Sequence, residues 1–379
     1  MASPLTIAHV DTESGFSGGQ VQVFLLMHGL RERGVRNLLL CRPGSQEQAQ
    51  AEEQGFEVAA VPMANDWHLS AIPRLAAVMR REGASLAHLH TGRANWLGGW
   101  AARRAGIPAI TTRRMDRPVK PGWLTRLTYE RLTCRAVAIA PAVAEILRRG
   151  GVPEDRIVTI CSSVDVEALR VPGAAGPTRE RLRAELGARD DQLLLLGLAR
   201  LTRRKGFDLL LQALAARRDD PRWALALAGE GEARHELQRQ AASLGLAERV
   251  RFPGRRDDVP ELLAAADVFV MPSRAEGLGV AALEAMAAGR PVLGARVGGL
   301  ADAVAHDETG LLVPPEDVPA LGAALDMLLN DSALRERLGA AGPVRVEAGF
   351  SARGMVDAYL ALYHDVLGDA PGSAPSPRA

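Results

Sequence analysis

Two glutamates near the middle of the second half of the chain are placed where they could bind a sugar or a nucleotide. Seven residues separate Glu276 from Glu284, and the glycines Gly277 and Gly279 follow the first of them. The surrounding pattern predicts a buried strand, a loop and a helix that begins near Gly279. Bare backbone at the first turn of a helix offers unpaired N–H groups and the positive end of the helix dipole. The segment therefore predicts an anion cradle beside two carboxylates.

The predicted helix is apolar on nearly every side, so Glu284 is expected to be half-buried and to need a polar partner such as a sugar hydroxyl. Another interpretation makes Glu276 a first-turn carboxylate favoured by the helix dipole and Glu284 an exposed helix residue. The glycines between the two glutamates favour the binding interpretation.

Two cations follow a predicted apolar strand, Leu193 to Leu198. They are Arg200 and Lys205, and Gly206 then opens the next predicted helix. An arginine fork and a lysine point charge at the carboxyl end of a strand suit a diphosphate. Lys205 is one of only two lysines in a chain with 46 lysines and arginines in all, the other being Lys120. The alternative is a basic surface turn.

A glycine-rich turn joins the first predicted strand, Thr6 to Val10, to a helix. Its glycines Gly18 and Gly19 do not form the Gly-x-Gly-x-x-Gly fingerprint, and the second strand ends in Arg42 instead of an acidic residue. This pattern argues against NAD or FAD. A phosphate-binding turn and a plain turn both remain open.

His88 and His90 end a predicted strand that begins at Leu86. Alternation places both on one face of the sheet, and His90 is nearer the loop where a ligand would lie. A structural histidine is the alternative for either residue.

The segment around Glu276 and Glu284 resembles the Glu-x7-Glu signature of the retaining, GT-B-fold glycosyltransferases of family 4, a family that includes lipopolysaccharide, mannosyl and sucrose-type transferases. Most members have Phe where this chain has Leu278. The resemblance implies that Glu276 contacts the donor sugar, that Glu284 holds the ribose, and that the amides of Gly277, Leu278, Gly279 and Val280 face sugar and diphosphate. It is strongest from Leu198 to Pro315.

The same resemblance implies roles for the other motifs. Arg200 and Lys205 would contact the donor diphosphate, and the Gly18–Gly19 pair would reach the donor phosphate. His90 would approach the hydroxyls of the donor sugar near the reacting centre. The sequence shows no cluster with metal-ligand spacing, and no metal is expected to be required if Arg200 and Lys205 stabilise the diphosphate. No cofactor is expected beyond the nucleoside diphosphate sugar that serves as donor.

Alternating strands and helices predict parallel sheets, and the resemblance specifies an α/β, GT-B fold with two doubly wound Rossmann-like domains facing an interdomain cleft. The expected parts are an acceptor-binding domain over residues 1–170, a linker and start of the second domain over 171–190, a nucleotide-sugar domain over 191–348, a helix crossing back over 349–368, and a disordered tail over 369–379.

Length and composition fit a soluble, cytoplasmic α/β protein of two domains. The 379 residues are 47% hydrophobic and 24% charged, and no secretory signal or membrane-spanning run is expected. Three widely separated cysteines predict free thiols. Aromatic residues make up only 4% of the chain, which argues against a nucleic-acid partner.

Residues 113–135 carry seven basic and two acidic residues with apolar residues among them, including Trp123. They are interpreted either as a solvated basic loop with an amphipathic helix packed on its own domain, or as a patch for anionic lipid or an acidic glycolipid at the inner face of the membrane.

The predicted function is transfer of a hexose-type sugar, with retention, from a nucleoside diphosphate sugar to a glycolipid or surface glycan such as lipopolysaccharide. A transferase with a soluble acceptor and a catalytically silent sugar-nucleotide-binding subunit are the alternatives. A sugar-nucleotide epimerase or a phosphorylase would share the fold, but the phosphorylase needs a Schiff-base lysine, and only Lys120 is spare.

Overall fold

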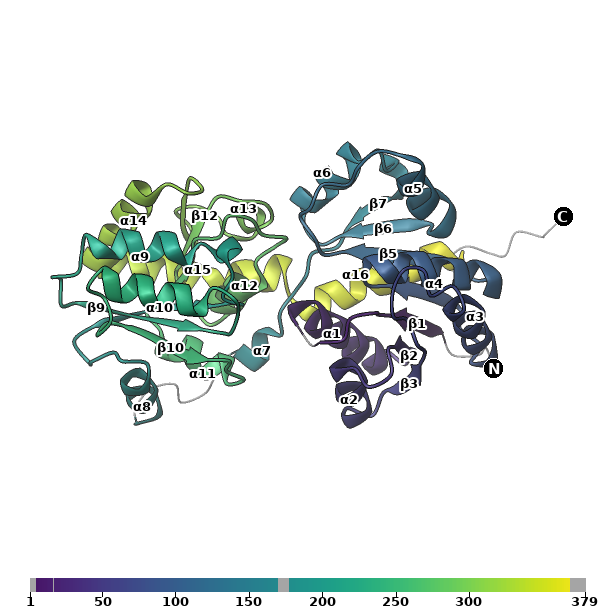
Figure 1. The fold of residues 1–379 in the computed structure, drawn as a ribbon, viewed down its shortest axis with the longest axis horizontal. Coiled ribbons are helices and arrows are strands. Elements are labelled where there is room, and N and C mark those ends of the chain that lie inside the picture. The colour runs from purple at the N-terminus through teal and green to yellow at the C-terminus, as the bar shows by residue number, and fades with distance from the viewer. Residues whose placement is uncertain (1–4, 16, 170–176, 369–379) are drawn as a thin grey trace. The chain divides into compact units, whose positions relative to one another are not determined.

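The computed structural model describes residues 5–15, 17–169 and 177–368, and Figure 1 shows the chain as a ribbon. Contacts divide the chain into two compact units, Met1–Ser162 with Ala352–Ala379, and Ser163–Ser351. Each unit has its own parallel sheet, which confirms the prediction of two Rossmann-like α/β domains. Residues 171–176 of the predicted linker and the tail 369–379 lie outside the described residues. The predicted domain bounds stay a prediction.

The described part of the first unit contains one sheet of seven parallel strands, in the order β3-β2-β1-β4-β5-β6-β7. Its strands are β1 (Thr6–Val10), β2 (Arg36–Cys41), β3 (Glu57–Ala60), β4 (Leu86–Leu89), β5 (Ala109–Arg113), β6 (Arg135–Ala138) and β7 (Ile157–Thr159). Strand β1 is buried at all five positions, as expected for a central parallel strand covered on both faces.

The helices of the first unit include α1, which begins at Gly18 with a capping box formed by Ser17 and Gln20. Thr91 caps α4 by accepting a hydrogen bond from the backbone N–H of Ala94 at 3.2 Å. The helices are α1 (Gly18–Glu32), α2 (Gln46–Glu53), α3 (Ala71–Arg81), α4 (Gly92–Ala105), α5 (Trp123–Arg126), α6 (Pro141–Arg149) and α16 (Ala352–Leu367), with a π-helix at Leu127–Leu132 and a 3₁₀ turn at Glu154–Arg156.

Helix α16 belongs to the first unit although it comes last in the chain. It buries Met355, Val356, Tyr359, Leu362 and Tyr363, a spacing that lines one face of a helix. These side chains share a hydrophobic cluster with residues of α1 and of the central strands. The cluster makes α16 part of the core of that unit.

The described part of the second unit contains one sheet of six parallel strands, in the order β10-β9-β8-β11-β12-β13. Its strands are β8 (Leu193–Leu198), β9 (Trp223–Ala228), β10 (Val250–Gly254), β11 (Val268–Met271), β12 (Val292–Ala295) and β13 (Gly310–Val313). Its helices are α7 (Val166–Leu169), α8 (Pro177–Glu185), α9 (Phe207–Ala215), α10 (Arg234–Ser243), α11 (Val259–Ala265), α12 (Val280–Ala287), α13 (Leu300–Ala303), α14 (Val318–Asn330) and α15 (Ser332–Gly349), with a 3₁₀ turn at Arg203–Lys205.

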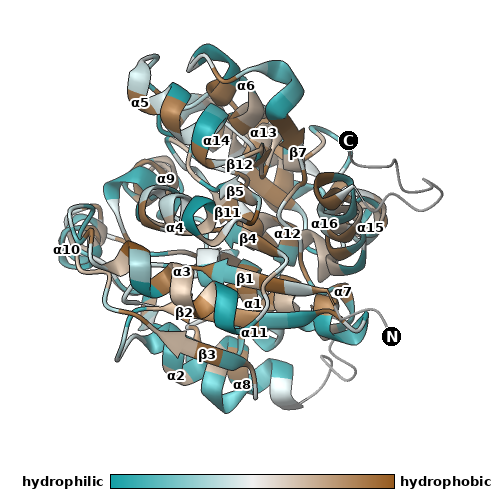
Figure 2. Cartoon of the chain, turned by 90° about the vertical axis from the view of Figure 1, so that its right-hand side faces the viewer, coloured by the Kyte–Doolittle hydropathy of each residue, from teal (hydrophilic) through white to brown (hydrophobic). Residues whose placement is uncertain are grey.

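Hydrophobic residues concentrate on the strands of both units. In Figure 2, β4 is largely brown, whereas α10 is mostly teal. No helix in the described ranges is both long enough and apolar enough to cross a bilayer.

The strand orders fix where ligands can bind in each unit. In an open parallel sheet, a crevice forms outside the carboxyl ends of the two strands at which the order reverses. This point lies between β1 and β4 in the first unit and between β8 and β11 in the second. The loops that follow these strands contain most of the residues singled out in the sequence.

Candidate active site

The loop after β11 and the turn after β8 meet at the switch point of the second unit. Lys205 Nζ lies 2.7 Å from Glu276 Oε1, and Ser273 Oγ donates to the same oxygen at 2.7 Å. The side chains of Lys205 and Glu276 are 21% and 7% exposed. The charge-assisted hydrogen bond from Lys205 is largely shielded from water, and it holds the Glu276 carboxylate in one orientation. The structure thus joins two of the predicted donor residues and adds Ser273 to them.

Glycines allow the loops of this site to pack backbone against backbone. A Cβ on Gly299 would lie 2.0 Å from the carbonyl oxygen of Gly277, and one on Gly298 would lie 2.1 Å from that of Glu276. Gly206, in the left-handed region with φ 68°, leaves 1.9 Å between a Cβ and the carbonyl oxygen of Pro272. Residues with side chains do not fit at these three positions. The turn at residues 297–299 and the turn after β8 therefore both pack closely against the loop.

Arg274 ties the same loop to α9. Its Nη1 and Nη2 donate to the two carboxylate oxygens of Asp208 at 2.7 Å each, and its Nε donates to Glu316 at 2.6 Å. Burial alone would raise the pKa of Asp208, but the bidentate guanidinium lowers it below the usual value. The carboxylate of Asp208 consequently stays charged and keeps the loop in place.

At the amino terminus of α12, the backbone N–H groups of residues 277–280 have no hydrogen-bond acceptor in the described part of the chain. Gly279 is the N-cap residue, with φ 86° and no side-chain hydrogen bond to the helix. Leu278 is only 2% exposed, so its side chain anchors the loop in the core. Helix dipole and free amides favour an anion or hydroxyl oxygen here.

Glu284 lies one helical turn into α12 and is not joined to Glu276. Burial raises the pKa of Glu284 to about 7 from an ordinary 4.5. In the part of the chain that the structure describes, its carboxyl group makes no hydrogen bond or ion pair. The sequence predicts that Glu284 is half-buried and needs a polar partner such as a ligand hydroxyl, and a buried carboxyl group without a protein partner is compatible with that prediction.

Arg200 differs from the other donor-binding candidates because its side chain is 77% exposed. Its Nη2 lies 3.7 Å from Glu232, and no contact with Glu276 is found among the described residues. The sequence predicts Arg200 and Lys205 as a pair of diphosphate ligands, but only Lys205 is fixed in the site without a ligand.

The first unit contains the other predicted site residues at its own switch point. Gly18 and Gly19 are the first two residues of α1, and a Cβ on Gly19 would lie 3.8 Å from the Arg114 side chain. His90 directly follows β4 and is 4% exposed. Both Nη atoms of Arg114 lie 3.4 Å from His90 Nδ1.

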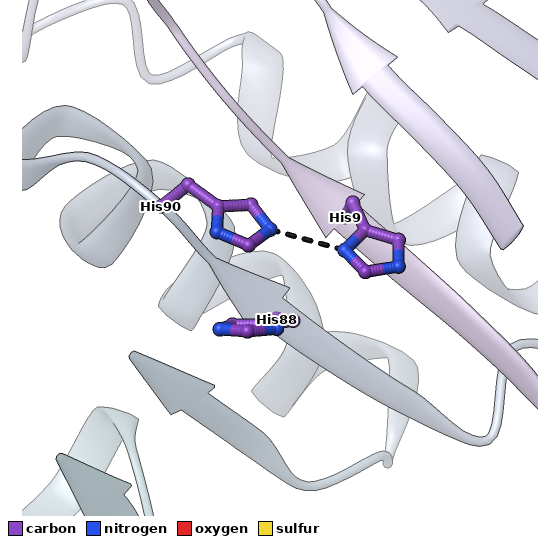
Figure 3. Close-up of side chains that lie close together, drawn as sticks. All are labelled: His9, His88 and His90. Atoms are coloured by element: carbon purple, nitrogen blue, oxygen red, sulfur yellow. Dashed lines mark hydrogen bonds between the residues drawn. The ribbon is translucent and has the colours of Figure 1, made fainter. Parts of the chain in front are cut away.

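His90 is one of three buried histidines whose nitrogens lie within 4.8 Å of one another, the others being His9 and His88 (Figure 3). Burial lowers the pKa of all three, to about 4 for His9, so the rings are neutral at neutral pH. Such a group has the ligand types for a metal ion, and the sequence interpretation does not predict it.

The ring nitrogens of His88 and His9 all lie within hydrogen-bond distance of other side chains. His88 contacts Tyr363 Oη at 2.8 Å and Thr112 Oγ1 at 2.7 Å. His9 contacts His90 Nε2 and Asn37 Oδ1, each at 3.0 Å. The cluster is therefore a hydrogen-bonded network, and the predicted independence from metal ions stays a prediction.

Sequence reasoning misses Ser273, Arg274 and His9. Ser273 stands three residues before Glu276, a spacing that lets a hydroxyl reach a carboxylate within one loop. His9 occupies the position in β1 beside His88 in β4, and this register becomes visible only once the strands are paired.

The chain is similar to known glycosyltransferases over most of its length. Residues 16–168 match the protein family described as Glycosyltransferase Family 4, and residues 178–345 match the family described as Glycosyl transferases group 1. The lipopolysaccharide core biosynthesis glycosyltransferase LpsE of Rhizobium meliloti is 30% identical over 360 residues, with 92% of this chain and 96% of that protein covered.

Two further proteins add a second type of relative and a solved fold. A D-inositol 3-phosphate glycosyltransferase of Streptomyces scabiei is 32% identical over 309 residues, covering 74% of this chain and 68% of that protein. The crystal structure of Anabaena HepE with UDP and glucose superposes with a TM-score of 0.83 at 21% identity, covering 95% of this chain and all of that one.

The structural match agrees with the predicted GT-B fold, and the family matches confirm the resemblance seen in the sequence. The chain therefore belongs to the glycosyl transferases group 1 family, and it is a glycosyltransferase similar to enzymes of lipopolysaccharide core biosynthesis.

Proposed function

We propose that this glycosyltransferase moves a hexose-type sugar from a nucleoside diphosphate sugar to a glycolipid or surface-glycan hydroxyl, such as one in lipopolysaccharide, with retention at the anomeric carbon. The observation that carries the proposal is the ion pair between the half-buried Lys205 and the buried Glu276, beside the amino terminus of α12. A cation, a carboxylate and free N–H groups at one switch point match the phosphate and hydroxyls of such a donor.

The donor contacts follow from the chemistry of each group. Lys205 has three N–H donors and gives one to Glu276, which leaves others for a diphosphate oxygen. Ser273 and Lys205 both bind Oε1 of Glu276, so Oε2 is the oxygen proposed to accept a sugar hydroxyl. Glu284 is proposed to accept the ribose hydroxyls, and the amides of residues 277–280 to face the sugar and the diphosphate.

Charge develops on the diphosphate as the bond to the sugar breaks. Lys205 and the α12 amides are fixed before the reaction, which is the condition for strong electrostatic stabilisation of a leaving group. Arg200 is exposed, so we propose that it turns onto the diphosphate when the donor binds. These cations do the work of a divalent metal ion, and turnover is expected to persist in a chelator.

Retention is proposed to result because the acceptor attacks the anomeric carbon from the same face that the diphosphate leaves. The leaving phosphate oxygen accepts the proton of the acceptor hydroxyl while the new bond to the anomeric carbon forms. Glu276 positions the sugar and does not become covalently bound. Gly18, Gly19 and His90 are proposed, from the family resemblance, to serve the donor phosphate and the sugar hydroxyls.

The acceptor proposal rests on the relatives and on the segment 113–135. This segment exposes Met115, Trp123 and Leu124, which are 46%, 71% and 52% exposed. Four basic residues of the same segment are also exposed, namely Arg117, Lys120, Arg126 and Arg131. Cations among large exposed apolar side chains suit an anionic membrane surface or an acidic glycolipid. We therefore propose a peripheral contact with the inner face of the cytoplasmic membrane.

A second candidate is transfer to a small soluble acceptor. The similarity to D-inositol 3-phosphate glycosyltransferases, whose name specifies a phosphorylated polyol, favours it. This candidate predicts that removing the exposed cations of segment 113–135 leaves turnover unchanged.

A transfer assay tests the proposal. The purified protein is incubated with UDP-, GDP-, ADP- or dTDP-hexoses and either truncated lipopolysaccharide or inositol phosphate, and products are identified by mass spectrometry. One donor should add a single hexose to the lipopolysaccharide, and NMR of the product should show the anomeric configuration of the donor. An inverted product would contradict retention, and a product on inositol phosphate alone would select the second candidate.

Glu276→Gln and Glu336→Gln form the control pair for this assay. Both replace one carboxylate by an amide, but Glu336 lies exposed on α15. Turnover should fall at least 100-fold in Glu276→Gln only. Donor binding without turnover on any acceptor, water included, would instead indicate a silent binding subunit.

A further inference from the structure

The orientation of the Asn37 side chain is fixed by two backbone carbonyls. Its Nδ2 lies 3.2 Å from the carbonyl oxygen of Met27 and 3.0 Å from that of Val35. Carbonyl oxygens only accept hydrogen bonds, so this atom must be the NH₂ group. The other amide atom, Oδ1, is therefore the oxygen that faces His9 Nε2 at 3.0 Å.

An amide oxygen accepts, so His9 carries its proton on Nε2. The ring is buried and neutral, with a pKa of about 4, and a neutral imidazole has only one N–H. The lone pair of His9 is therefore on Nδ1, which faces His90 Nε2 at 3.0 Å (Figure 3). His90 must donate in this contact.

His90 is neutral for the same reason, since burial lowers its pKa well below the usual value. Its single proton lies on Nε2, and Nδ1 has the lone pair. Among the described residues, Nδ1 is faced by the two Nη atoms of Arg114, which only donate, at 3.4 Å each. The chain of hydrogen bonds is thus consistent from Asn37 to Arg114.

We propose that Asn37 and His9 are positioning residues that fix the ring and the tautomer of His90, so that His90 meets a substrate hydroxyl through Nδ1, as a hydrogen-bond acceptor. This inference rests on the proposed function, in which His90 meets a sugar hydroxyl. The Arg114 contacts are long for N–H donors. A hydroxyl at about 2.8 Å is a better donor to Nδ1 than either of them.

His88 does not change the tautomers assigned to His9 and His90. Both nitrogens of His88 are engaged, by Tyr363 Oη and by Thr112 Oγ1. A metal ion bound by the three rings would need the lone pair of His9 Nδ1, which the His90 N–H already occupies. A tightly bound metal would therefore contradict the proposal.

The tautomers can be read without any substrate. Long-range proton–nitrogen NMR spectra of protein labelled with ¹⁵N-histidine distinguish Nε2–H from Nδ1–H rings, and single His→Gln variants assign the signals. His9 and His90 should both show the Nε2–H pattern at pH 7. An Nδ1–H or protonated His90, or one equivalent of zinc that is lost in His9→Gln, would overturn the proposal.

Two substitutions of His9 separate positioning from simple packing. Glutamine can donate to Asn37 and accept from His90 at once, whereas leucine fills space and does neither. His9→Leu should lower kcat about 100-fold with KM for the donor within about threefold, because misorientation of a catalytic group is felt in the transition state. His9→Gln should stay within about fivefold of the parent.

Equal losses in both variants, or no loss in His9→Leu, would overturn the positioning role. If His9→Leu does not fold, the comparison of His9→Gln with the parent decides, since the glutamine variant must keep the Nε2–H tautomer of His90. If the parent shows no turnover, the proposed function fails while the tautomer assignment is still tested by NMR.

Discussion

Lys205 and Glu276 are 71 residues apart in sequence, and the two turns that carry them meet at one oxygen. Residue types and spacing make both of them candidates, because a cation before a glycine and a carboxylate before a helix each suggest phosphate or sugar chemistry. Their direct contact could not be predicted, since it depends on the register of β8 and β11. The contact of His9 with the other histidines could not be predicted either, because it depends on the pairing of β1 with β4.

Glu284 supplies a pH-dependent prediction. Its pKa is about 7 when folded and 4.5 when unfolded, so between these values the folded carboxyl holds a proton that the unfolded one has released. Stability contributed by Glu284 therefore falls as pH rises from 4.5 to 7. Glu284→Gln should gain stability over the parent between pH 5 and pH 8, by up to about 3 kcal/mol. Urea unfolding at the two pH values measures it, with Glu336→Gln as the unaffected control.

Donor binding should show the opposite dependence. A carboxylate accepts hydroxyl hydrogen bonds better than a carboxyl group, so donor affinity in the parent should rise about tenfold from pH 6 to pH 8. Calorimetric titration of Glu284→Gln should give a weaker affinity that hardly changes with pH. A parent affinity that is flat across this range would remove Glu284 from the donor site.

At the scale of elements, bounds that depend on local pattern were predicted well. Strands β1 and β8 begin and end at the predicted residues. Their sequences are mostly apolar runs bounded by turn residues, so local preference and burial agree.

Helix α15 is not predicted, because Gly339, Gly342 and Pro343 interrupt it. The structure gives the reason for the glycines. A Cβ on Gly339 would lie 2.5 Å from the carbonyl oxygen of Gly289, and one on Gly342 would lie 2.6 Å from that of Met286. Close packing against the end of α12 thus outweighs helix preference, and such contacts are invisible in one sequence.

The turn at residues 297–299 yields the prediction for this scale. Gly299→Ala places a methyl group against the Gly277 carbonyl, so the loop that carries Glu276 must shift. Donor affinity should fall at least tenfold, because a shift of this size misplaces a hydrogen-bonding group, with a loss of stability of about 1–3 kcal/mol. Calorimetric titration and urea unfolding measure the two effects.

Gly349→Ala is the matched control, because a Cβ there meets nothing within 4 Å. Its donor affinity should equal that of the parent. An unchanged affinity in Gly299→Ala would show that the loop does not need this contact.

At the scale of the whole molecule, the sequence predicts two α/β domains and a GT-B fold, and both are confirmed. The sequence also shows that positive charge is concentrated in the first half of the chain, since residues 1–170 have 21 basic and 16 acidic side chains. The acceptor cannot be predicted from the sequence, because its recognition depends on loop shape and not on a motif.

Charge in segment 113–135 gives the prediction for the whole molecule. The protein should sediment with vesicles that contain about 30% anionic lipid, and binding should weaken with salt. Replacing Arg117, Lys120 and Arg126 by alanine should lower vesicle affinity at least 30-fold, since each cation near such a surface contributes about 1 kcal/mol. Its control removes three exposed arginines of the second unit instead, Arg218, Arg239 and Arg255, and should bind like the parent.

The most direct test of the central claim is calorimetric titration of the parent, Lys205→Ala and Arg203→Ala with UDP-, GDP-, ADP- and dTDP-hexoses. Both variants remove one positive charge from the same 3₁₀ turn, but only Lys205 contacts Glu276. One nucleotide sugar should bind the parent and Arg203→Ala alike and bind Lys205→Ala at least 30-fold more weakly. Equal weakening in both variants, or no binding of any nucleotide sugar to the parent, would contradict the assignment of this site to the donor.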